Sequence, residues 1–315
     1  MASTIPRRRR QPAQLMQADP RPRRRRRRGR GGRQAVAFIV QVAAALLAIA
    51  AVTSLTSAVT DALRGSEAEI VPPARALPPV AAAAYVVVDG GTGQPLASYN
   101  ADQPRPVASL TKLMTARLVL DAGHLEHTAT VPSLRIAGDE SQAGLEPGEH
   151  VSRGELLRAM LVASAGDAAR TLAVDVAGDE GRFVRMMNAE AAAAGLDATR
   201  YANPDGLDDP AQHSSAADVA HLARDLMRDP AFRRIVAAET TRLDGSDLRT
   251  TNDLLGTYRG ADGIKTGHTD EAGWCIAASA TRNGHRILVV VLGAPSEQAR
   301  DAGARALLDY GFSVA

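Results

Sequence analysis

Lysine is nearly absent from this chain of 315 residues. Of its 37 lysine and arginine residues, only Lys112 and Lys265 are lysines. Arginine stays charged at any ordinary pH, whereas a lysine whose pKa is lowered by burial or by a nearby cation can accept a proton. An arginine-biased composition alone would also leave few lysines. The alternative is that both positions need a compact or removable ammonium group, and the sequence around each lysine bears on that choice.

The single cysteine, Cys275, excludes an intramolecular disulfide and a cysteine-based zinc cluster. Cys275 lies in an apolar run, Trp274-Cys275-Ile276-Ala277-Ala278, so we expect a small buried hydrophobic residue rather than a reactive thiol. The seven histidines include no His-Glu-x-x-His pair, so the sequence predicts no metal site. No segment of about 20–50 residues repeats, which argues against a solenoid.

Charge is distributed unevenly along the chain. Residues 1–34 contain 13 arginines and one acidic residue, so residues 35–315 carry a net charge of −10 although the whole chain has +2. The arginine-rich segment is interrupted by proline and glycine and has nothing to bury, which predicts a disordered cytoplasmic tail. Such a run is also typical of nucleic-acid-binding arms. Next to a membrane segment, it fits better a topology signal that contacts anionic lipids, so we expect no nucleic acid partner.

An uncharged stretch follows over residues 35–60. Its 26 residues exceed the ~20 apolar residues that span a bilayer. Arginines before it and an acidic domain after it predict an anchor with the N-terminus inside the cell and the domain outside, on the periplasmic or cell-wall side. A cleaved signal peptide is the alternative, since Thr56-Ser57-Ala58 offers small residues, and the protein would then be secreted. We favour the uncleaved anchor because the apolar stretch and the charged leader are both long for a signal peptide.

Residues 61–79 predict a proline-containing linker, and residues 80–315 a single folded domain. Strands are predicted over residues 84–89 and 95–99, and a second hairpin over residues 274–280 and 286–292, joined around Asn283-Gly284. Helices are predicted over residues 109–120, 154–176, 180–194 and 300–310, and after the capping-box-like Ser215-Ala216-Ala217-Asp218. We therefore expect an α/β (α+β) domain whose antiparallel sheet is built from the two terminal hairpins and is flanked by a helical region.

Ser109 and Lys112 are three positions apart at the start of a predicted helix, so both side chains project from the same face. The helix N-terminus stabilises negative charge that develops there. A serine hydroxyl becomes a good nucleophile when a base takes its proton, and a neutral Lys112 could be that base. Burial and the second cation, Lys265, would both lower its pKa. A helix-capping serine beside a surface lysine is the structural alternative.

A second motif supports catalysis. In Lys265-Thr266-Gly267-His268-Thr269, a cation and a hydroxyl precede a glycine that allows a ligand to approach a strand edge closely. Ser-x-x-Lys followed by Lys-Thr-Gly matches the signature of penicillin-binding proteins and class A β-lactamases. The order of the motifs makes the match specific.

With these motifs, the sequence resembles the serine-type D-alanyl-D-alanine carboxypeptidases, the low-molecular-mass penicillin-binding proteins of peptidase family S11. The resemblance covers residues 82–313 and implies a serine β-lactamase/DD-peptidase-like fold. Many members add a β-rich domain and an amphipathic C-terminal anchor, so here we expect the N-terminal segment to anchor the protein. Further matches are Ser164-Ala165-Gly166-Asp167-Ala168-Ala169, Asn203-Pro204-Asp205-Gly206-Leu207, His213-Ser214-Ser215-Ala216-Ala217-Asp218, Thr251-Asn252-Asp253-Leu254-Leu255 and residues 262–269.

The resemblance implies catalytic roles for three residues. Ser109 would be the acylating nucleophile and Lys112 its general base. Ser164 would relay a proton toward the leaving amine. Lys265 would help to keep Lys112 neutral and would orient the substrate.

The resemblance also implies a substrate-binding edge. Thr266 would donate a hydrogen bond to the terminal carboxylate of the substrate, beside Gly267. The backbone N–H groups of Ser109 and His268 would form the oxyanion hole. Arg300 stands where the family has a carboxylate-binding arginine, and a solvated helix arginine is its alternative. The family mechanism needs no cofactor.

One residue departs from the family pattern. The middle motif is Ser-x-Asn in the family, whereas the third position here is Gly166. The asparagine amide contacts the substrate and the catalytic lysine, so turnover is slowed unless a neighbouring group or water substitutes. Asp167 matches another family residue and should point elsewhere. We interpret Asn203 and Asn252 as structural residues of a turn and a loop.

The sequence therefore predicts a penicillin-sensitive D,D-carboxypeptidase that removes the terminal D-alanine from peptidoglycan stem pentapeptides through a Ser109 acyl-enzyme. A D,D-endopeptidase acting on cross-links would use the same residues. A β-lactamase is disfavoured because no Glu-x-x-Leu-Asn motif is present. A weakly catalytic paralogue that binds peptidoglycan or β-lactams is a further alternative, in which replacing Gly166 by asparagine should raise activity.

Overall fold

The computed structural model describes residues 43–53, 76–134 and 140–315. The chain divides into two units, Met1–Pro72 and Pro73–Ala315. The predicted span over residues 35–60 lies mostly outside the described residues, as do the predicted tail and most of the predicted linker. What is described of the first unit is a helix over residues 43–53, with exposed Leu46, Leu47, Ile49 and Val52. Within the described part, no helix has the length and apolar character needed to cross a bilayer.

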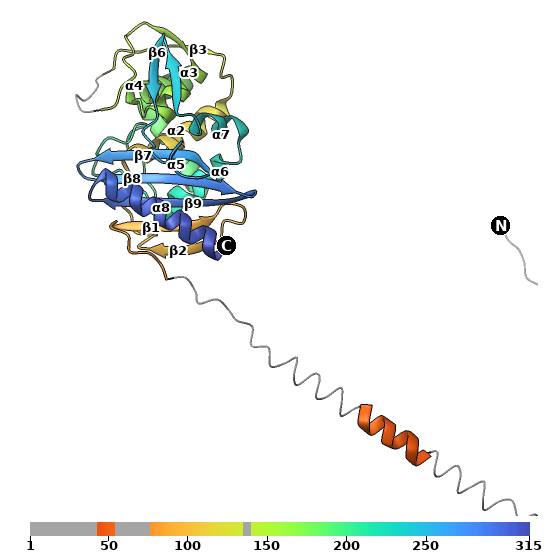
Figure 1. Cartoon of the computed structure of the whole chain (residues 1–315). Helices are drawn as coiled ribbons and strands as arrows, with labels where there is room; N and C mark the ends of the chain where they lie inside the picture. Colours follow the sequence, from red (N-terminus) through yellow and green to blue (C-terminus); the bar gives the residue numbers. More distant parts are fainter. Residues whose placement is uncertain (1–42, 54–75, 135–139) are drawn as a thin grey trace, which may run out of the picture. The chain divides into compact units, whose positions relative to one another are not determined.

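A five-stranded antiparallel sheet forms the centre of the second unit (Figure 1). The N-terminal and C-terminal hairpins lie side by side because β1 pairs with β9, as the sequence predicts. Strand β7 (Ala261–Thr269) carries the Lys-Thr-Gly motif and lies at one edge of the sheet, paired with β8. In spatial order the strands are β2 (Pro95–Tyr99), β1 (Ala84–Asp89), β9 (His285–Ala294), β8 (Gly273–Arg282) and β7 (Ala261–Thr269).

The sheet is covered on both faces, which explains why β9 is apolar at consecutive positions instead of alternate ones. Val289 and Val291 pack in one cluster with Leu307 of helix α8 (Glu297–Val314). Val290, on the opposite face, belongs to the larger core beneath the other helices. Helix α8 lies along one face of the sheet in Figure 1. The β8–β9 hairpin thus separates two cores.

The helical region that the sequence predicts is present, and with the antiparallel sheet it confirms the predicted fold class. Two short ribbons accompany it, formed by β3 with β4 and by β5 with β6. In chain order the elements are the 3-10 turn η1 (Ala108–Thr111), α2 (Lys112–Ala122), β3 (Thr128–Thr130), β4 (His150–Ser152), α3 (Arg153–Val162), α4 (Gly166–Ala177), α5 (Glu180–Ala193), α6 (Ala216–Leu226), α7 (Pro230–Val236), β5 (Thr240–Leu243) and β6 (Ser246–Arg249).

The prediction of one helix over residues 154–176 is wrong. The chain leaves the helix after Val162 and begins α4 at Gly166. Ser164, between the two helices, has φ +63°, a left-handed conformation that interrupts the right-handed helix. The predicted helix over residues 109–120 likewise begins as a 3-10 turn that contains Ser109. In both places the backbone departs from regular helix at a serine of the predicted site.

Two local predictions have clear outcomes. Ser215 caps α6 by accepting a hydrogen bond from the Asp218 backbone N–H. The Asp218 carboxylate instead accepts hydrogen bonds from the Ala198 backbone and the Thr199 hydroxyl. The reciprocal half of the predicted capping box is therefore replaced by a tertiary contact. Cys275 is fully buried, and burial raises the pKa of its thiol to about 11, which confirms a structural cysteine.

Candidate active site

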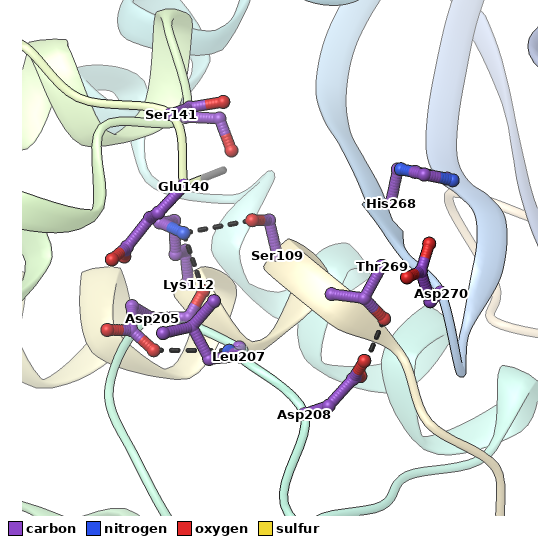
Figure 2. A pocket seen from close by; sticks show the side chains of 12 residues that line it. Ser109, Lys112, Glu140, Ser141, Asp205, Leu207, Asp208, His268, Thr269 and Asp270 are labelled. Atoms are coloured by element: carbon purple, nitrogen blue, oxygen red, sulfur yellow. Dashed lines mark hydrogen bonds between the residues drawn. The ribbon is translucent and has the colours of Figure 1, made fainter. Parts of the chain in front are cut away.

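The centre of the site is a direct contact between Ser109 and Lys112. The Lys112 ammonium donates hydrogen bonds to Ser109 Oγ at 2.9 Å and to the Asp205 carbonyl oxygen at 2.5 Å. Ser109 lies in the 3-10 turn that leads into α2, and Lys112 is the first residue of that helix. Figure 2 shows both bonds converging on the lysine amine. Ser109 and Lys112 are thus held together by one helical turn.

The environment of Lys112 favours its neutral form. Only 2% of the residue is exposed. Burial is the largest cause that lowers its pKa, and the positive charge of Arg170 lowers it further. The negative charges of Asp205, Glu140 and Asp167 oppose this shift. A buried lysine with a lowered pKa can take the serine proton, as general base catalysis requires.

Ser164 and Lys265 form a second pair in the same site. Lys265 Nζ donates a hydrogen bond to Ser164 Oγ at 2.9 Å and another to the Thr266 carbonyl oxygen at 2.8 Å. Burial lowers the pKa of Lys265 well below its usual range, and the charges of Lys112 and Arg300 add to the effect. The two lysines therefore lie close enough to influence each other, each beside a serine hydroxyl.

A cleft of about 490 Å³ opens next to these pairs. Its lining includes Ser109, Lys112, Ser164 and His268 from the predicted site. Figure 2 labels Ser109, Lys112 and His268 in this cleft. The same lining includes Glu140, Ser141, Asp205, Gly206, Leu207, Asp208, Thr269 and Asp270. The structure thus brings residues from α2, the α3–α4 break and β7 to one cavity.

The β7 strand lies against the turn that carries Ser109. A Cβ atom at Gly267 would lie 2.8 Å from the Ser109 backbone nitrogen, so a larger residue would press on that N–H group. The His268 ring stacks on Trp274 of β8 with 4.1 Å between ring centroids. The Thr266 hydroxyl lies 2.5 Å from that of Thr251. Glycine at position 267 thus permits the close approach of β7 to Ser109.

Arg300 is buried, with 2% of the residue exposed, so the alternative of a solvated arginine is wrong. Its guanidinium donates hydrogen bonds to Asp301 at 2.7 Å and Glu297 at 3.2 Å. The group also lies 5.5 Å from the centre of the Trp274 ring. Arg300 is outside the cleft lining, but its charge acts on Lys265.

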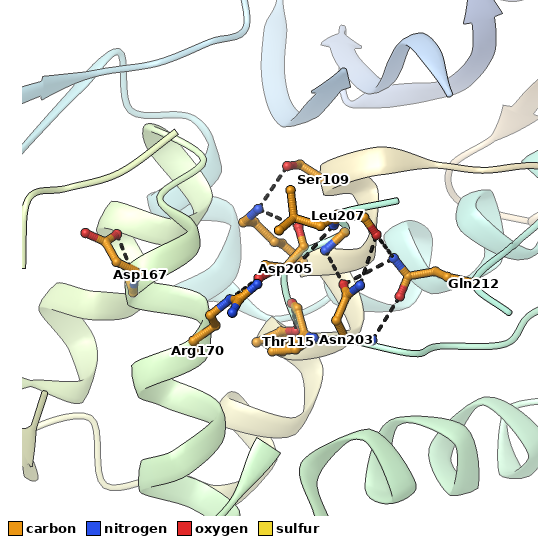
Figure 3. Close-up of polar contacts among 12 residues, drawn as sticks. Ser109, Thr115, Asp167, Arg170, Asn203, Asp205, Leu207 and Gln212 are labelled. Atoms are coloured by element: carbon orange, nitrogen blue, oxygen red, sulfur yellow. Dashed lines mark hydrogen bonds and ion pairs between the residues drawn. The ribbon is translucent and has the colours of Figure 1, made fainter. Parts of the chain in front are cut away.

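The loop after α5 lies below Ser109 in Figure 3 and contacts Lys112 through the Asp205 carbonyl oxygen. The Asn203 carbonyl side chain accepts from the Gly206 N–H at 2.7 Å, and its amide donates to the Leu207 carbonyl at 2.9 Å. The Asp205 carboxylate forms an ion pair with Arg170 of α4. These contacts place the Asp205 carbonyl oxygen beside Lys112. Asn203 is therefore a turn residue, as interpreted from the sequence.

Two further expectations can be compared with the structure. The Asp167 carboxylate accepts hydrogen bonds from the Ala143, Gly144 and Leu145 backbone N–H groups, so it points away from the cleft as expected. Asn252 accepts from the Leu254 N–H within its own loop, consistent with a structural residue. In the described part of the chain, no group of histidine, cysteine and acidic residues is arranged to hold a metal ion.

Sequence reasoning missed Arg170 and Glu140 as members of the site. Arg170 lies one helical turn after the middle motif, where nothing in the sequence distinguishes it from other surface arginines. Glu140 lies in the loop before β4, and the structure places it in the cleft beside Lys112. The available signal was Gly166, a missing side chain at a position where the family has a polar one.

Comparison with known proteins identifies the family. The family model for D-alanyl-D-alanine carboxypeptidases, peptidase S11, matches residues 72–296. The chain is 35% identical over 238 residues to the D-alanyl-D-alanine carboxypeptidase DacF of Bacillus subtilis, with 72% of this chain and 61% of that protein covered. It is 36% identical over 261 residues to DacD of Escherichia coli, with 78% of this chain and 67% of that protein covered. The chain thus spans about 61–67% of the length of these relatives.

Solved structures give the same result. Penicillin binding protein 6B from Escherichia coli superposes with a TM-score of 0.72 at 35% identity, covering 76% of this chain and 80% of that chain. The Streptomyces K15 DD-transpeptidase superposes with a TM-score of 0.72 at 31% identity, covering 76% of this chain and 99% of that chain. By sequence, by fold and by the arrangement of its serine–lysine pairs, the chain belongs to the D-alanyl-D-alanine carboxypeptidase family, peptidase family S11.

Proposed function

We propose that this protein is a serine D,D-carboxypeptidase that removes the terminal D-alanine from peptidoglycan stem pentapeptides. The observation that carries the proposal is the 2.9 Å contact between the Ser109 hydroxyl and a buried Lys112 whose pKa is lowered. Membership of the S11 family supplies the substrate class. β-Lactams, which resemble the terminal dipeptide, would acylate the same serine and inhibit the enzyme.

Acylation begins with proton transfer from Ser109 Oγ to the neutral Lys112 amine. The serine oxygen attacks the carbonyl carbon of the penultimate D-alanine and forms a tetrahedral oxyanion. The backbone N–H groups of Ser109 and His268 stabilise the negative charge that develops on this oxygen. The C–N bond then breaks, and the Lys112 ammonium passes its proton through Ser164 to the leaving amine, which returns Lys112 to its neutral form. Free D-alanine leaves, and the acyl group stays on Ser109.

Deacylation reverses the proton path. Water attacks the ester carbonyl while Lys112 accepts one water proton, and the Ser109 oxygen leaves and is protonated again.

Lys265 and the Thr266 hydroxyl bind the terminal carboxylate of the incoming peptide, and Arg300 adds positive potential from beneath Trp274. The buried Lys265–Ser164 bond supports this assignment, because it ties the carboxylate-binding strand to the proton relay.

The location of the reaction follows from the substrate. Residues 35–60 would anchor the chain with its N-terminus in the cytoplasm, and residues 80–315 would act on the periplasmic or cell-wall side. The absence of charge over these 26 residues and the arginines before them support this arrangement. Partners would be stem peptides and the membrane.

The decisive experiment measures D-alanine release from a stem pentapeptide by the full chain in detergent, with the Ser109→Ala variant as control. Serine-dependent release establishes the carboxypeptidase. A folded protein that binds penicillin through Ser109 but releases no D-alanine is instead a weakly catalytic binding paralogue. Labelling of Ser109→Ala by a fluorescent penicillin overturns the assignment of the nucleophile.

A further inference from the structure

The space beside Gly166 is filled by the side chain of Glu140. A Cβ atom at residue 166 would overlap the Glu140 carboxyl group and lie 2.9 Å from its Cγ atom. The Gly166 N–H donates a hydrogen bond to the Ser141 carbonyl oxygen at 2.8 Å, so the loop that carries Glu140 is fixed to the start of α4. The carboxyl group therefore reaches this position because residue 166 has no side chain.

The two carboxyl oxygens of Glu140 are buried close to the Asp205 carboxylate, a neighbour that disfavours the ionised form. Both of these Glu140 oxygen atoms lack a hydrogen-bond donor among the described residues. Glu140 lines the cleft together with Ser109, Lys112 and Ser164, and Figure 2 shows its side chain extending past Lys112. An unpaired buried carboxyl group costs free energy, and such groups concentrate where a ligand or a reaction uses them.

The surroundings of Glu140 favour the neutral form of its carboxyl group, mainly through burial. Burial raises the pKa of Glu140 to about 7, and the negative charge of Asp205 adds to the shift. Lys112 and Arg170 oppose it. In turn, the negative charge of an ionised Glu140 raises the pKa of Lys112. The protonation states of Glu140 and Lys112 thus depend on each other, and Lys112 contacts Ser109 directly.

A neutral carboxyl group presents one O–H donor and one C=O acceptor side by side. A side-chain amide presents the same pair, and the family has such an amide at residue 166. We propose that the neutral carboxyl group of Glu140 takes over this role from a different loop, directing the Lys112 amine toward Ser109 and binding the substrate amide next to the scissile bond. The inference rests on the proposed function, because it assumes acylation of Ser109.

The sign of the pH dependence follows from the two protonation states. When Glu140 ionises, it loses its donor and attracts the Lys112 ammonium, so acylation falls as pH rises through about 7. Protonation of Lys112 also stops acylation, because an ammonium group cannot accept the serine proton. The charged groups that face the pair are Asp205 and Arg170, which act on both Lys112 and Glu140, and Asp167, which acts on Lys112.

The test measures the acylation rate by a fluorescent penicillin against pH in the full chain. Glu140→Gln keeps a donor and an acceptor but cannot ionise. We expect it to keep a rate within about fivefold of wild type at neutral pH, to lose the alkaline decline, and to shift the acidic limb to lower pH. Glu140→Ala should lower the rate about 100-fold, the loss expected for one positioned donor. Glu146→Gln, an exposed glutamate of the same segment, is the matched control.

A compensating pair separates catalysis from folding. Gly166→Asn alone should lower the rate, because the new side chain collides with Glu140. The weakly catalytic paralogue predicts the opposite, a rise in activity. Combined with Glu140→Ala, the same Gly166→Asn change should recover at least about tenfold of the lost rate, since the amide then occupies the vacated space. Melting curves of every variant exclude loss of folding as the cause.

Two outcomes overturn the inference. One is a Glu140→Gln profile that keeps the wild-type alkaline decline. The other is a double variant no faster than Glu140→Ala. If wild type releases D-alanine through Ser109 and either outcome appears, only the role of Glu140 fails. If wild type neither releases D-alanine nor takes up label at Ser109, the proposed function itself fails.

Discussion

Lys265 Nζ lies 2.9 Å from Ser164 Oγ, although 101 positions separate the two residues. The bond joins the edge strand of the sheet to the break between α3 and α4. Across it, a buried lysine whose pKa lies well below its usual range meets a serine with φ +63°. The proposed proton transfer through Ser164 would thus depend on a contact between the two halves of the domain.

Two substitutions of Ser164 distinguish the effect of its hydroxyl group from the effect of its backbone conformation. Ser164→Ala and Ser164→Gly both remove the relay, and we expect each to lower penicillin acylation and D-alanine release about 100-fold. Glycine adopts a positive φ freely, so Ser164→Gly should be about 1 kcal/mol more stable than Ser164→Ala in urea unfolding. Activity that follows stability, with the glycine variant near wild type, would show that the backbone matters and the hydroxyl does not.

Lys112→Arg tests the need for a removable proton. Arginine keeps the positive charge and cannot act as a base at ordinary pH. We therefore expect acylation by a fluorescent penicillin to fall about 1,000-fold. Lys112→Met, which removes the charge at similar length, should fall as far. An arginine variant that retains a tenth of the wild-type rate would contradict the assignment of Lys112 as the base.

The raised pKa of Glu140 should make the stability of the protein depend on pH. Because this carboxyl group holds its proton more tightly in the folded state than in the unfolded state, stability falls as pH rises from about 4.5 to about 7. Glu140→Gln does not titrate and should melt above wild type at pH 8, with the difference absent at pH 4. Thermal melting followed by circular dichroism measures both. An equal effect at the two pH values would place the benefit of glutamine elsewhere.

Asp89 should change the stability with pH in the opposite direction to Glu140, because its pKa is lowered. The Thr92 backbone N–H and the His285 ring, 2.6 Å away, lower the pKa of Asp89 to about 2. Its contribution is present above about pH 4 and is lost as pH falls through about 2. After screening of a partly exposed pair it should amount to about 1 kcal/mol.

Asp89→Asn should therefore melt roughly 2–4 °C below wild type at pH 7. The exposed Asp102→Asn variant is the control and should melt with wild type. The difference should vanish at pH 2. A constant difference between Asp89→Asn and wild type at both pH values would assign the loss to packing rather than charge.

The sequence predicted the sheet better than the helices. Asn283 and Gly284 adopt positive φ values of 52° and 80°, as a two-residue hairpin turn requires, and this local chemistry fixed the register of β8 against β9. The sequence did not predict the break at Ser164, because apolar residues continue through it with helical spacing. Its conformation is imposed by Lys265 and by the loop before β4, contacts that no local pattern encodes.

The candidate site likewise has a part that the sequence predicted and a part that only the structure shows. Ser109 and Lys112 meet because one helical turn brings them together, so their spacing was sufficient. Glu140 comes from an irregular loop 26 positions before Gly166 and matches no motif. Only the tertiary structure reveals that the missing side chain at one position makes room for a carboxyl group from another.

The scarcity of lysine and cysteine has a practical consequence once their burial is known. Lys112 and Lys265 are 2% and 1% exposed, and Cys275 is fully buried with a raised thiol pKa. The folded chain therefore offers amine-reactive and thiol-reactive reagents no accessible lysine or cysteine side chain. Each of these three groups becomes reactive when the domain opens. Covalent labelling over time, followed by mass spectrometry, therefore measures the rate at which the catalytic core opens.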